Sequence, residues 1–194
     1  MASDPARRST QPAPPAGDAQ LVLDFTNSHA DRFGRPERFA DAAGLADWLA
    51  ERGFADAATD VTAADAASAR GLRDAVITLL LGHADDPHTS TQALAEAEEQ
   101  LRRTATRHPL VTVIHGSGAR LAPAQQGLPA ALATVLAAIA HLALAGSWQR
   151  LKACRNPGCH FTFYDRSRNT SGAYCSNTCS TQVAMRSYRR RQRT

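Results

Sequence analysis

The chain contains only four cysteines, and all of them lie in one short stretch. Their spacing is Cys154-x4-Cys159-x15-Cys175-x3-Cys179. Two close pairs joined by a polar loop let four thiolates converge on one point, which a tetrahedral zinc ion with Zn–S bonds of ~2.3 Å requires. Pro157-Gly158 predicts a turn inside the first pair, and Ser176-Asn177 predicts a helix N-cap inside the second.

Two disulfides are the alternative use of these cysteines, and they need an oxidising compartment. The first residues, MASDPARRSTQPAPPAGDAQ, have no apolar core of the kind that a signal peptide carries. The most apolar segment, 128–144, is rich in Ala, carries His141 and falls short of the ~18 residues that a membrane span needs. We therefore expect a cytoplasmic protein, in which paired cysteines are more often metal sites than disulfides.

The expected zinc is structural. A catalytic zinc keeps one position open for water and has a proton shuttle nearby, whereas four sulfurs fill every position here. Asp165 is the only acidic residue after Gln149. A tail with few large apolar residues needs the metal in order to fold. The sequence predicts one structural Zn²⁺ held by Cys154, Cys159, Cys175 and Cys179.

The residues around the cysteines resemble a known family. The segment WQRLKACRNPGCHFTFYDRSRNTSGAYCSNTC is similar to the CGNR-type zinc finger of bacterial transcription regulators. Upstream, LVLDFTNS (21–28) and LADWLAERG (45–53) resemble the opening of the ABATE-type domain that precedes this finger in the family. The resemblance implies a regulatory domain followed by a zinc finger. The matching positions in the finger are Trp148, Arg150, Leu151, Cys154, Phe163, Asp165, Ser167, Arg168, Asn169 and the final Cys-x3-Cys.

One departure from the family pattern concerns its signature. Ser180-Thr181-Gln182 replaces the Gly-Asn-Arg that follows the last cysteine in the family. The cysteine itself is kept. Whether the family uses its Asn and Arg on nucleic acid or to brace the cysteine loop, Thr181 and Gln182 cannot play that role in the same way.

Charge is distributed unevenly along the chain. Residues 1–149 carry 12 Arg against 17 Asp and Glu, a net charge of −5, whereas residues 150–194 carry nine Arg and one Lys against one Asp, a net charge of +9. Four thiolates around Zn²⁺ would reduce this positive charge by two and leave most of it in place. Such asymmetry predicts a polyanionic partner for the second segment, and DNA is the expected one.

The sequence SNTCSTQVAMRSYRRRQR predicts a helix that begins after Ser176. Helical spacing places two stripes on it: an arginine stripe of Arg186, Arg189, Arg190 and Arg193, and a less polar stripe of Thr181, Ala184, Met185 and Tyr188. We expect the less polar stripe to pack on the zinc module. The arginine stripe would contact phosphates or guanine edges, with Arg166 and Arg168 assisting from the loop. The alternative is a solvated helix end whose arginines favour the helix dipole and solubility.

The remaining chain reads as one mostly helical domain. Residues 1–19 are rich in Pro, Ala, Ser and Thr and are expected to be a disordered tail. Helices are predicted over 43–52, 63–81, 91–106 and 128–144, and a β-hairpin over 110–121 with its turn at 116–118. LVLDFTNS is predicted to form a strand or a first turn, in which Asp24 and Asn27 act as caps.

Enzyme motifs are missing from the sequence. HGSG (115–118) lacks the Gly-x-Ser-x-Gly elbow and is explained by the hairpin turn. The seven histidines form no His-x3-His or His-Glu-x2-His pair, and no P-loop or dinucleotide fingerprint is present. We therefore expect a binding protein rather than an enzyme.

The predicted fold is mostly α (α+β): a helical domain with a small β-hairpin, then a small four-cysteine module that ends in a basic helix. Its expected parts are the tail 1–19, an ABATE-like regulatory domain 20–146 and a CGNR-like finger 147–194. The predicted function is zinc-dependent DNA binding and transcription regulation, with a homodimer and a small-molecule effector as further expectations. The alternative function is a zinc-stabilised interaction module that binds an acidic protein partner.

Overall fold

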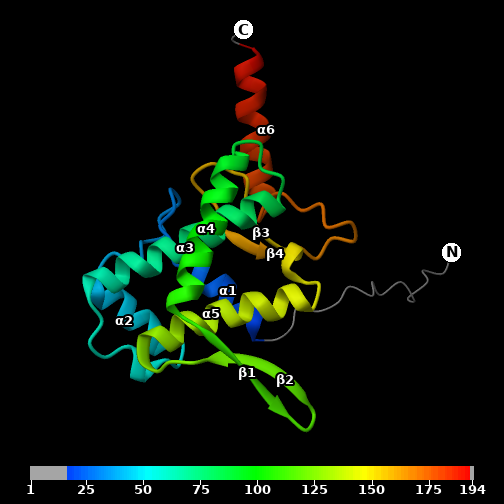
Figure 1. The fold of residues 1–194 in the computed structure, drawn as a ribbon. Helices are drawn as coiled ribbons and strands as arrows, with labels where there is room; N and C mark the ends of the chain where they lie inside the picture. The colour runs from blue at the N-terminus through cyan, green and yellow to red at the C-terminus, as the bar shows by residue number, and fades with distance from the viewer. Residues whose placement is uncertain (1–16, 193–194) are drawn as a thin grey trace, which may run out of the picture.

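The computed structural model of the chain describes residues 17–192 (Figure 1). Most of the tail expected over 1–19, and Arg193, lie outside these residues. The helices are α1 Asp18–Thr26, α2 Ala42–Glu51, α3 Ala63–His83, α4 Thr91–Arg107, α5 Gly127–Leu144 and α6 Asn177–Arg191, with short 3-10 turns η1 Ala55–Ala57 and η2 Trp148–Arg150. The strands are β1 Leu110–His115, β2 Gly118–Pro123, β3 Leu151–Ala153 and β4 Thr162–Tyr164. We call residues 17–146 the helical domain and residues 147–192 the cysteine module.

In the helical domain, α2, α3 and α4 each begin where a side chain caps the first free backbone N–H groups. The Asp41 carboxylate accepts a hydrogen bond from the N–H of Gly44 at the start of α2. Thr62 and Asp65 form a reciprocal capping box at the start of α3, and Ser90 caps α4. The predicted helices over 43–52, 63–81, 91–106 and 128–144 are confirmed to within two residues at each end.

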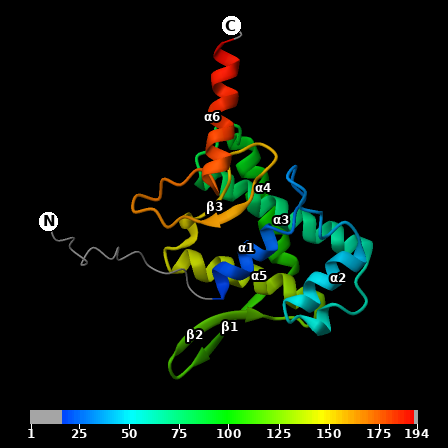
Figure 2. The same ribbon diagram turned by 180° about the vertical axis from the view of Figure 1, so that it is seen from behind.

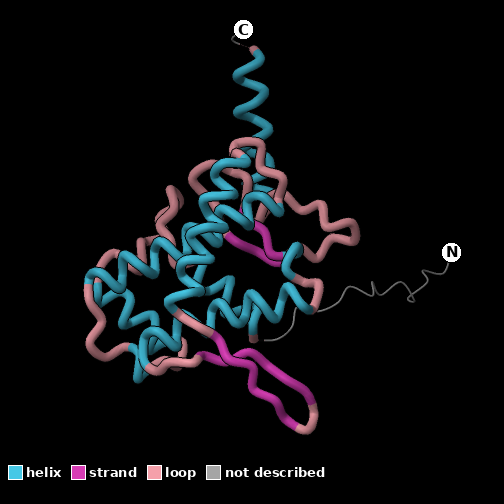
Figure 3. Tube along the Cα trace, viewed as in Figure 1, coloured by secondary structure: helices cyan, strands magenta, loops and turns pink. Residues whose placement is uncertain are grey.

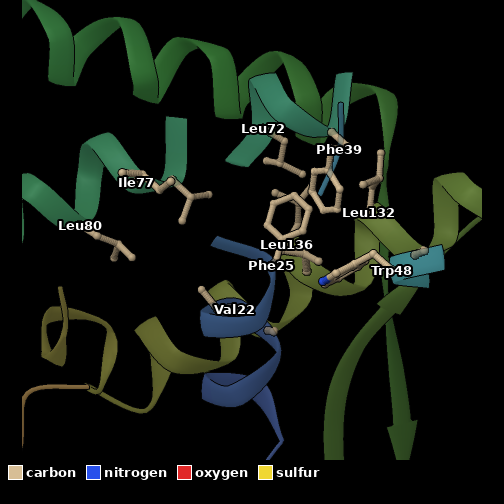
Figure 4. Close-up of a cluster of buried hydrophobic side chains, with 14 of the residues drawn as sticks. Val22, Phe25, Phe39, Trp48, Leu72, Ile77, Leu80, Leu132 and Leu136 are labelled. Atoms are coloured by element: carbon tan, nitrogen blue, oxygen red, sulfur yellow. The ribbon is translucent and has the colours of Figure 1, made fainter. Parts of the chain in front are cut away.

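The core of the helical domain lies between α1, α2, α3 and α5 (Figure 4). At its centre three aromatic rings meet: the Phe25 and Phe39 centroids are 5.7 Å apart, and Trp48 lies 5.6 and 5.5 Å from them. Tilted and edge-on ring contacts of this kind add to the hydrophobic stabilisation. Leu72 and Leu80 of α3 are fully buried beside this cluster.

The prediction of a strand or first turn over residues 21–28 is wrong, because Asp18–Thr26 forms helix α1. Its buried side chains, Ala19, Val22, Phe25 and Thr26, recur at intervals of three and four residues, which is the period of a helix and not of a strand. They face α5 and α3. Asn27 is the C-cap residue of this helix.

Helix α5 is the most apolar element of the chain. By length and composition it could cross a membrane, but 44% of its residues are buried inside the protein. It packs against α1, η1 and β2. It therefore forms part of the protein's own core.

The predicted β-hairpin is confirmed. Strands β1 and β2 pair antiparallel from Leu110↔Pro123 to His115↔Gly118, and Gly116-Ser117 makes a two-residue turn. Figure 3 shows the hairpin in magenta, extending away from the helices. His141 of α5 fixes its base by accepting a hydrogen bond from the N–H of Leu121 at 3.2 Å.

The cysteine module begins as part of the main core. Strand β3 pairs antiparallel with β4 and packs on α3, and Leu151 and Ala153 are fully buried in the same cluster as the helical domain's side chains. These two short strands were not predicted from the sequence. The module is therefore docked on the helical domain rather than tethered to it.

Candidate metal centre and basic surface

The first cysteine pair is held by the predicted turn. The N–H of Cys159 donates to the carbonyl of Asn156 at 2.9 Å, and Gly158 has a φ of 82°. Pro at the second position of a turn and a positive φ at the third are the features of a type II β-turn. An added Cβ at Gly158 would lie 2.7 Å from Cδ of Arg32, so this glycine also lets the helical domain approach closely.

The second cysteine pair is held by the start of α6. Ser176 is the N-cap residue, as predicted, and its hydroxyl accepts a hydrogen bond from the N–H of Cys179 at 3.3 Å. Cys175 precedes the cap and Cys179 lies in the first helical turn. One hydrogen bond thus sets both the helix start and the separation of the two thiols.

All four thiol sulfurs lie within 4.8 Å of one another. The Sγ atoms of Cys159 and Cys175 are 3.8 Å apart, and those of Cys175 and Cys179 are 3.7 Å apart. A tetrahedron with Zn–S bonds of ~2.3 Å has edges of about 3.8 Å. All four cysteines are free, so the geometry agrees with a zinc ion and not with the disulfide alternative.

The surroundings favour the protonated form of two of these thiols, those of Cys159 and Cys175. Hydrogen bonding to Cys154 and burial raise the pKa of the Cys159 thiol far above its ordinary value. Burial and the neighbouring Cys159 raise the pKa of Cys175 to about 11. Zinc binds thiolates, so the metal must displace protons, and its affinity falls as the pH falls.

Asp165, the only acid of the module, organises the loop between the two cysteine pairs. Its carboxylate accepts hydrogen bonds from the N–H groups of Ser167 at 2.8 Å and Gly172 at 2.7 Å, and lies 3.2 Å from Nζ of Lys152. The Asp165 and Lys152 side chains are each only 3% exposed. Burial opposes ionisation of Asp165, but these hydrogen bonds outweigh it and hold its pKa below the ordinary value. Asp165 is therefore structural.

The segment after α1 clamps the cysteine module onto the helical domain. The Asn27 side chain accepts from the N–H of Thr162 at 2.8 Å and donates to its carbonyl at 3.0 Å, as a neighbouring strand would. The two ring nitrogens of His29 lie 2.7 Å from the carbonyl oxygen of Thr26 and 3.0 Å from that of Cys159. Arg35 stacks on the Phe161 ring at 5.0 Å. Sequence analysis had assigned Asn27 only a capping role.

This clamp segment is anchored in turn by a buried ion pair. Arg73 of α3 makes a two-pronged contact with Glu37, at 2.5 and 2.9 Å, and its guanidinium lies 5.4 Å from the Phe39 ring centroid. The Arg73 side chain is 3% exposed. Residues 27–39 therefore connect α3 with the first cysteine pair through contacts at both ends.

Gln182, which replaces the family's Arg, lies inside the module. Its carbonyl oxygen accepts hydrogen bonds from the side-chain amide of Asn156 at 3.0 Å and from Arg32 at 3.3 Å. Asn156 is fully buried in the first cysteine loop. In this chain the position braces the cysteine loop against α6, whereas Thr181 next to it is exposed.

Helix α6 packs by a different face from the one predicted. Gln182, Val183 and Ser187 are half-buried, whereas the predicted packing stripe of Thr181, Ala184, Met185 and Tyr188 is exposed. Polar contacts decide the packing face, because Asn156 of the cysteine module and Arg32 of the helical domain both hydrogen-bond to Gln182 of α6. Beyond its first turns the helix stands clear of the body (Figures 1 and 2).

The predicted arginines fall into three groups. Arg166 and Arg168 are exposed on the loop that Asp165 holds. Arg186 is exposed, but its guanidinium donates to the side-chain oxygen of Asn156 at 3.1 Å. Arg189 and Arg190 are exposed in the last turn of α6, together with Arg191.

Comparison with protein families assigns both parts of the chain. Residues 19–146 match the ABATE model, described as "Putative stress-induced transcription regulator", and residues 150–192 match the CGNR zinc finger model. No curated protein matches the chain significantly. Both models describe regulator and zinc-finger types rather than enzymes. The zinc-finger match and the clustered thiols together give one structural zinc site. Because the first model covers more than half of its residues, the chain belongs to the ABATE family and carries a CGNR zinc finger after that domain.

Proposed function

We propose that the protein is a cytoplasmic, zinc-dependent DNA-binding transcription regulator. The metal is held by Cys154, Cys159, Cys175 and Cys179 and folds the cysteine module. Residues 20–146 act as the sensing or dimerisation domain, and residues 147–194 bind DNA. The proposed contacts with DNA come from Arg166, Arg168, Arg186, Arg189, Arg190 and Arg193.

The observation that carries the proposal is the exposed basic half of α6. After Ser187 every described residue of the helix is exposed, and Arg189, Arg190 and Arg191 follow in sequence. A helix that is polar all round gains little from packing on its own protein. Its width suits the major groove of B-DNA, and its guanidinium groups suit phosphates and guanine edges.

The arginines differ in what they can contribute to DNA binding. The side chain of Arg189 is exposed on α6, so it can reach the phosphates of a bound duplex. Arg186 is oriented by Asn156 and supplies a positioned donor at the base of the helix. Arg166 and Arg168 extend the basic surface from a loop whose shape Asp165 fixes.

A protein partner is the second candidate, and two side chains favour it. Met185 and Tyr188 of α6 are 48% and 53% exposed, and both lie to one side of the arginine stripe. Exposed Met and aromatic residues beside arginines are typical of protein interfaces. In this reading α6 docks an acidic partner protein and makes no sequence-specific DNA contact.

The deciding experiment compares matched charge losses. The double variant Arg166→Ala/Arg189→Ala removes two module arginines, and Arg107→Ala/Arg120→Ala removes two exposed arginines of the helical domain. Binding of each to a duplex from the gene's own promoter region is measured across salt concentrations. We expect the first variant alone to lose affinity several-fold and to show a shallower salt dependence.

Sequence preference separates regulation from nonspecific polyanion binding. The wild type should prefer its promoter duplex over a scrambled duplex by ~10³ or more. Elemental analysis of the same preparation tests the metal assignment. We expect one zinc per chain, and we expect the zinc to be lost once the thiols are alkylated. No binding at low salt by zinc-loaded wild type would overturn the DNA proposal and leave the protein-partner reading.

Oligomeric state and effector binding follow from the domain assignment and need separate tests. Gel filtration at several concentrations reports on dimer formation. A thermal-shift screen of metabolites on the full chain reports on sensing. A monomer whose stability responds to no metabolite would contradict the sensing or dimerisation role of residues 20–146.

A further inference from the structure

A pocket of about 270 Å³ lies where three segments meet: the α3–α4 loop, the first cysteine loop and α6. The first cysteine loop and α6 supply its arginines, the α3–α4 loop supplies a carboxylate and an imidazole, and an aromatic ring comes from the residue before the second cysteine pair. The residues that define its chemistry are His88, Arg155, Tyr174, Arg186, Arg190 and Asp86. It is separate from the zinc site, because none of the four cysteines lines it.

Two of its three guanidinium groups are positioned by contacts outside the pocket. Arg155 donates through Nε to the carbonyl of Ala84, and its Nη2 lies 3.9 Å from the Asp85 carboxylate. Arg186 donates through Nη1 to the buried side chain of Asn156. A guanidinium carries five N–H donors, so each of these groups keeps donors for a ligand. Positioned donors bind more tightly because little side-chain freedom is lost on binding.

The balance of charge in the pocket favours an anion. Three arginines face one carboxylate, Asp86, whose oxygen accepts a hydrogen bond from the hydroxyl of Thr89 at 2.9 Å. Arginine forks match the oxygens of phosphate, and several converging guanidinium groups are a recurrent way to hold one. A neutral ligand would offer these guanidinium groups no negative charge.

One wall of the pocket is largely apolar. Tyr174 packs on the cysteine cluster with its side chain half-buried, and Val183 and two prolines complete the wall. Such a surface suits a flat ring rather than a second charged group. The volume lies near the lower limit for small-molecule sites, which run from about 300 Å³ upwards.

We propose that this pocket binds a small phosphorylated ligand of about the size of a nucleoside monophosphate, with its phosphate on Arg155, Arg186 and Arg190 and its ring against Tyr174. The ligand would join the α3–α4 loop of the helical domain to α6 of the cysteine module. Arg186 and Arg190 also belong to the proposed DNA contacts, so ligand and DNA would compete for them. That competition rests on the proposed function, whereas ligand binding does not.

The test uses the full zinc-loaded chain without DNA. Isothermal titration with adenosine and cytidine 5′-monophosphate should give saturable binding, inorganic phosphate should bind more weakly, and adenosine should not bind. Arg190→Gln should weaken nucleotide binding about tenfold or more, because one charge-assisted contact is lost. Arg189→Gln, with the same charge change on a residue outside the pocket, should leave binding unchanged.

Two further variants test the proposed ring contact and the helical-domain side of the pocket. Tyr174→Leu should weaken nucleotide binding and leave inorganic phosphate binding unchanged, provided that zinc content stays at one per chain. His88→Asn, on the helical-domain side of the pocket, should weaken nucleotide binding. Absence of saturable binding by either nucleotide, or equal affinity in Arg190→Gln and Arg189→Gln, would overturn the proposal. Binding of duplex DNA alone, without either nucleotide, would also overturn it and assign these arginines to nucleic acid.

Discussion

The helical domain and the cysteine module are stabilised by opposite means. The helical domain buries large apolar side chains, among them Phe25, Phe39 and Leu72, which are fully excluded from solvent. The module buries thiols, an amide and the Lys152–Asp165 ion pair instead. Apolar burial holds the first region without help, whereas buried polar groups stabilise only when each is satisfied. The module therefore depends on its metal and on a few specific contacts.

The change from apolar to metal-dependent stabilisation does not occur where the two family matches meet, between residues 146 and 150. Strand β3 belongs to the module by sequence, yet Leu151 and Ala153 are buried in the core of the helical domain. His83 of α3 also packs edge-on against Trp148, and its Nδ1 donates a hydrogen bond to the carbonyl oxygen of Leu151 at 2.9 Å. The metal-dependent part should begin only after β3.

The largest expected effect comes from removing a metal ligand. Cys179→Ser should abolish zinc binding, and structural zinc contributes on the order of 10–16 kcal/mol in zinc-finger peptides. Residues 154–191 should then lose protection from hydrogen exchange, while α3 keeps its protection. Hydrogen exchange by mass spectrometry, with Ser180→Ala as the neighbouring control, measures this. Equal loss of protection in α3 would show that the two regions fold as one unit.

The next effect concerns the buried ion pair of the module. Asp165→Asn leaves the Lys152 ammonium buried without its partner, which costs about 3–5 kcal/mol. Faster zinc release to a chelator should report this loss. The double variant Lys152→Met/Asp165→Asn removes both charges and should recover part of the stability. A single variant that releases zinc at the wild-type rate would contradict the structural role of Asp165.

Disrupting the apolar core should destabilise the helical domain and leave the zinc site intact. Leu72→Ala should lower the free energy of unfolding of the helical domain by about 2–5 kcal/mol. Zinc content should stay at one per chain while the protein is folded. Denaturant titration followed by circular dichroism measures the change, and Leu144→Ala, at a side chain that is 82% exposed, should be near neutral. Equal effects of the two variants would be inconsistent with this core.

A smaller effect is expected where the two regions meet. Asn27→Ala removes its two hydrogen bonds with Thr162 and a third from Arg35. It leaves the buried backbone of Thr162 unsatisfied, at a cost of about 1–3 kcal/mol. Calorimetry should then resolve two unfolding transitions in the variant, one for each region. In the wild type the two regions should unfold closer together in temperature. Asn169→Ala, on the exposed loop, is the matched control. A single unchanged transition would mean that Asn27 does not couple the regions.

The smallest effect is a difference in acid response. Burial opposes ionisation of Glu37, but hydrogen bonding to Arg73 outweighs it and lowers its pKa from the ordinary 4.5. Its contribution to stability is therefore complete above pH 4.5 and is lost as the pH falls through the lower folded-state pKa. Acid should release zinc first, because protons compete for the thiolates, and unfold the helical domain later.

The two steps can be followed separately. A chromophoric chelator reports zinc release, and circular dichroism reports helix content, over the same pH series. Glu37→Gln should make the second step less steep and leave the first unchanged. An identical second step in this variant would show that Glu37 contributes no pH-dependent stability.

Local signals explain which elements could be predicted from the sequence. Capping residues such as Thr62 and Ser90, and the turn residues Gly116-Ser117, act within a few positions and leave a readable pattern. The cysteine spacing is equally local and predicted the cluster of thiols. Helix α1 was missed because its nine residues contain too few turns for the helical period to stand out from a strand pattern.

Long-range polar contacts explain what the sequence could not show. Asn27 contacts a residue 135 positions away, and no local pattern indicates that its amide will mimic a strand. The packing face of α6 differs from the one that apolar spacing predicts, because the side-chain oxygen of Gln182 finds donors in Asn156 and Arg32. No local pattern indicates the arginine pocket either, since it combines residues 86–88 of the α3–α4 loop with residues between 155 and 190.

The position of Cys179 in the first turn of α6 makes the metal a nucleus for that helix. Starting a helix is the costly step, with a nucleation constant of about 10⁻³, whereas each later residue adds one hydrogen bond for one residue fixed. Zinc and the Ser176 cap fix the first turn in advance. The helix then needs only to propagate through the exposed turns that carry the arginines, without a further nucleation cost. An isolated helix of 15 residues would be marginal in water. The helix–coil equilibrium of α6 should therefore follow metal occupancy, and its far end should fray on warming before its start.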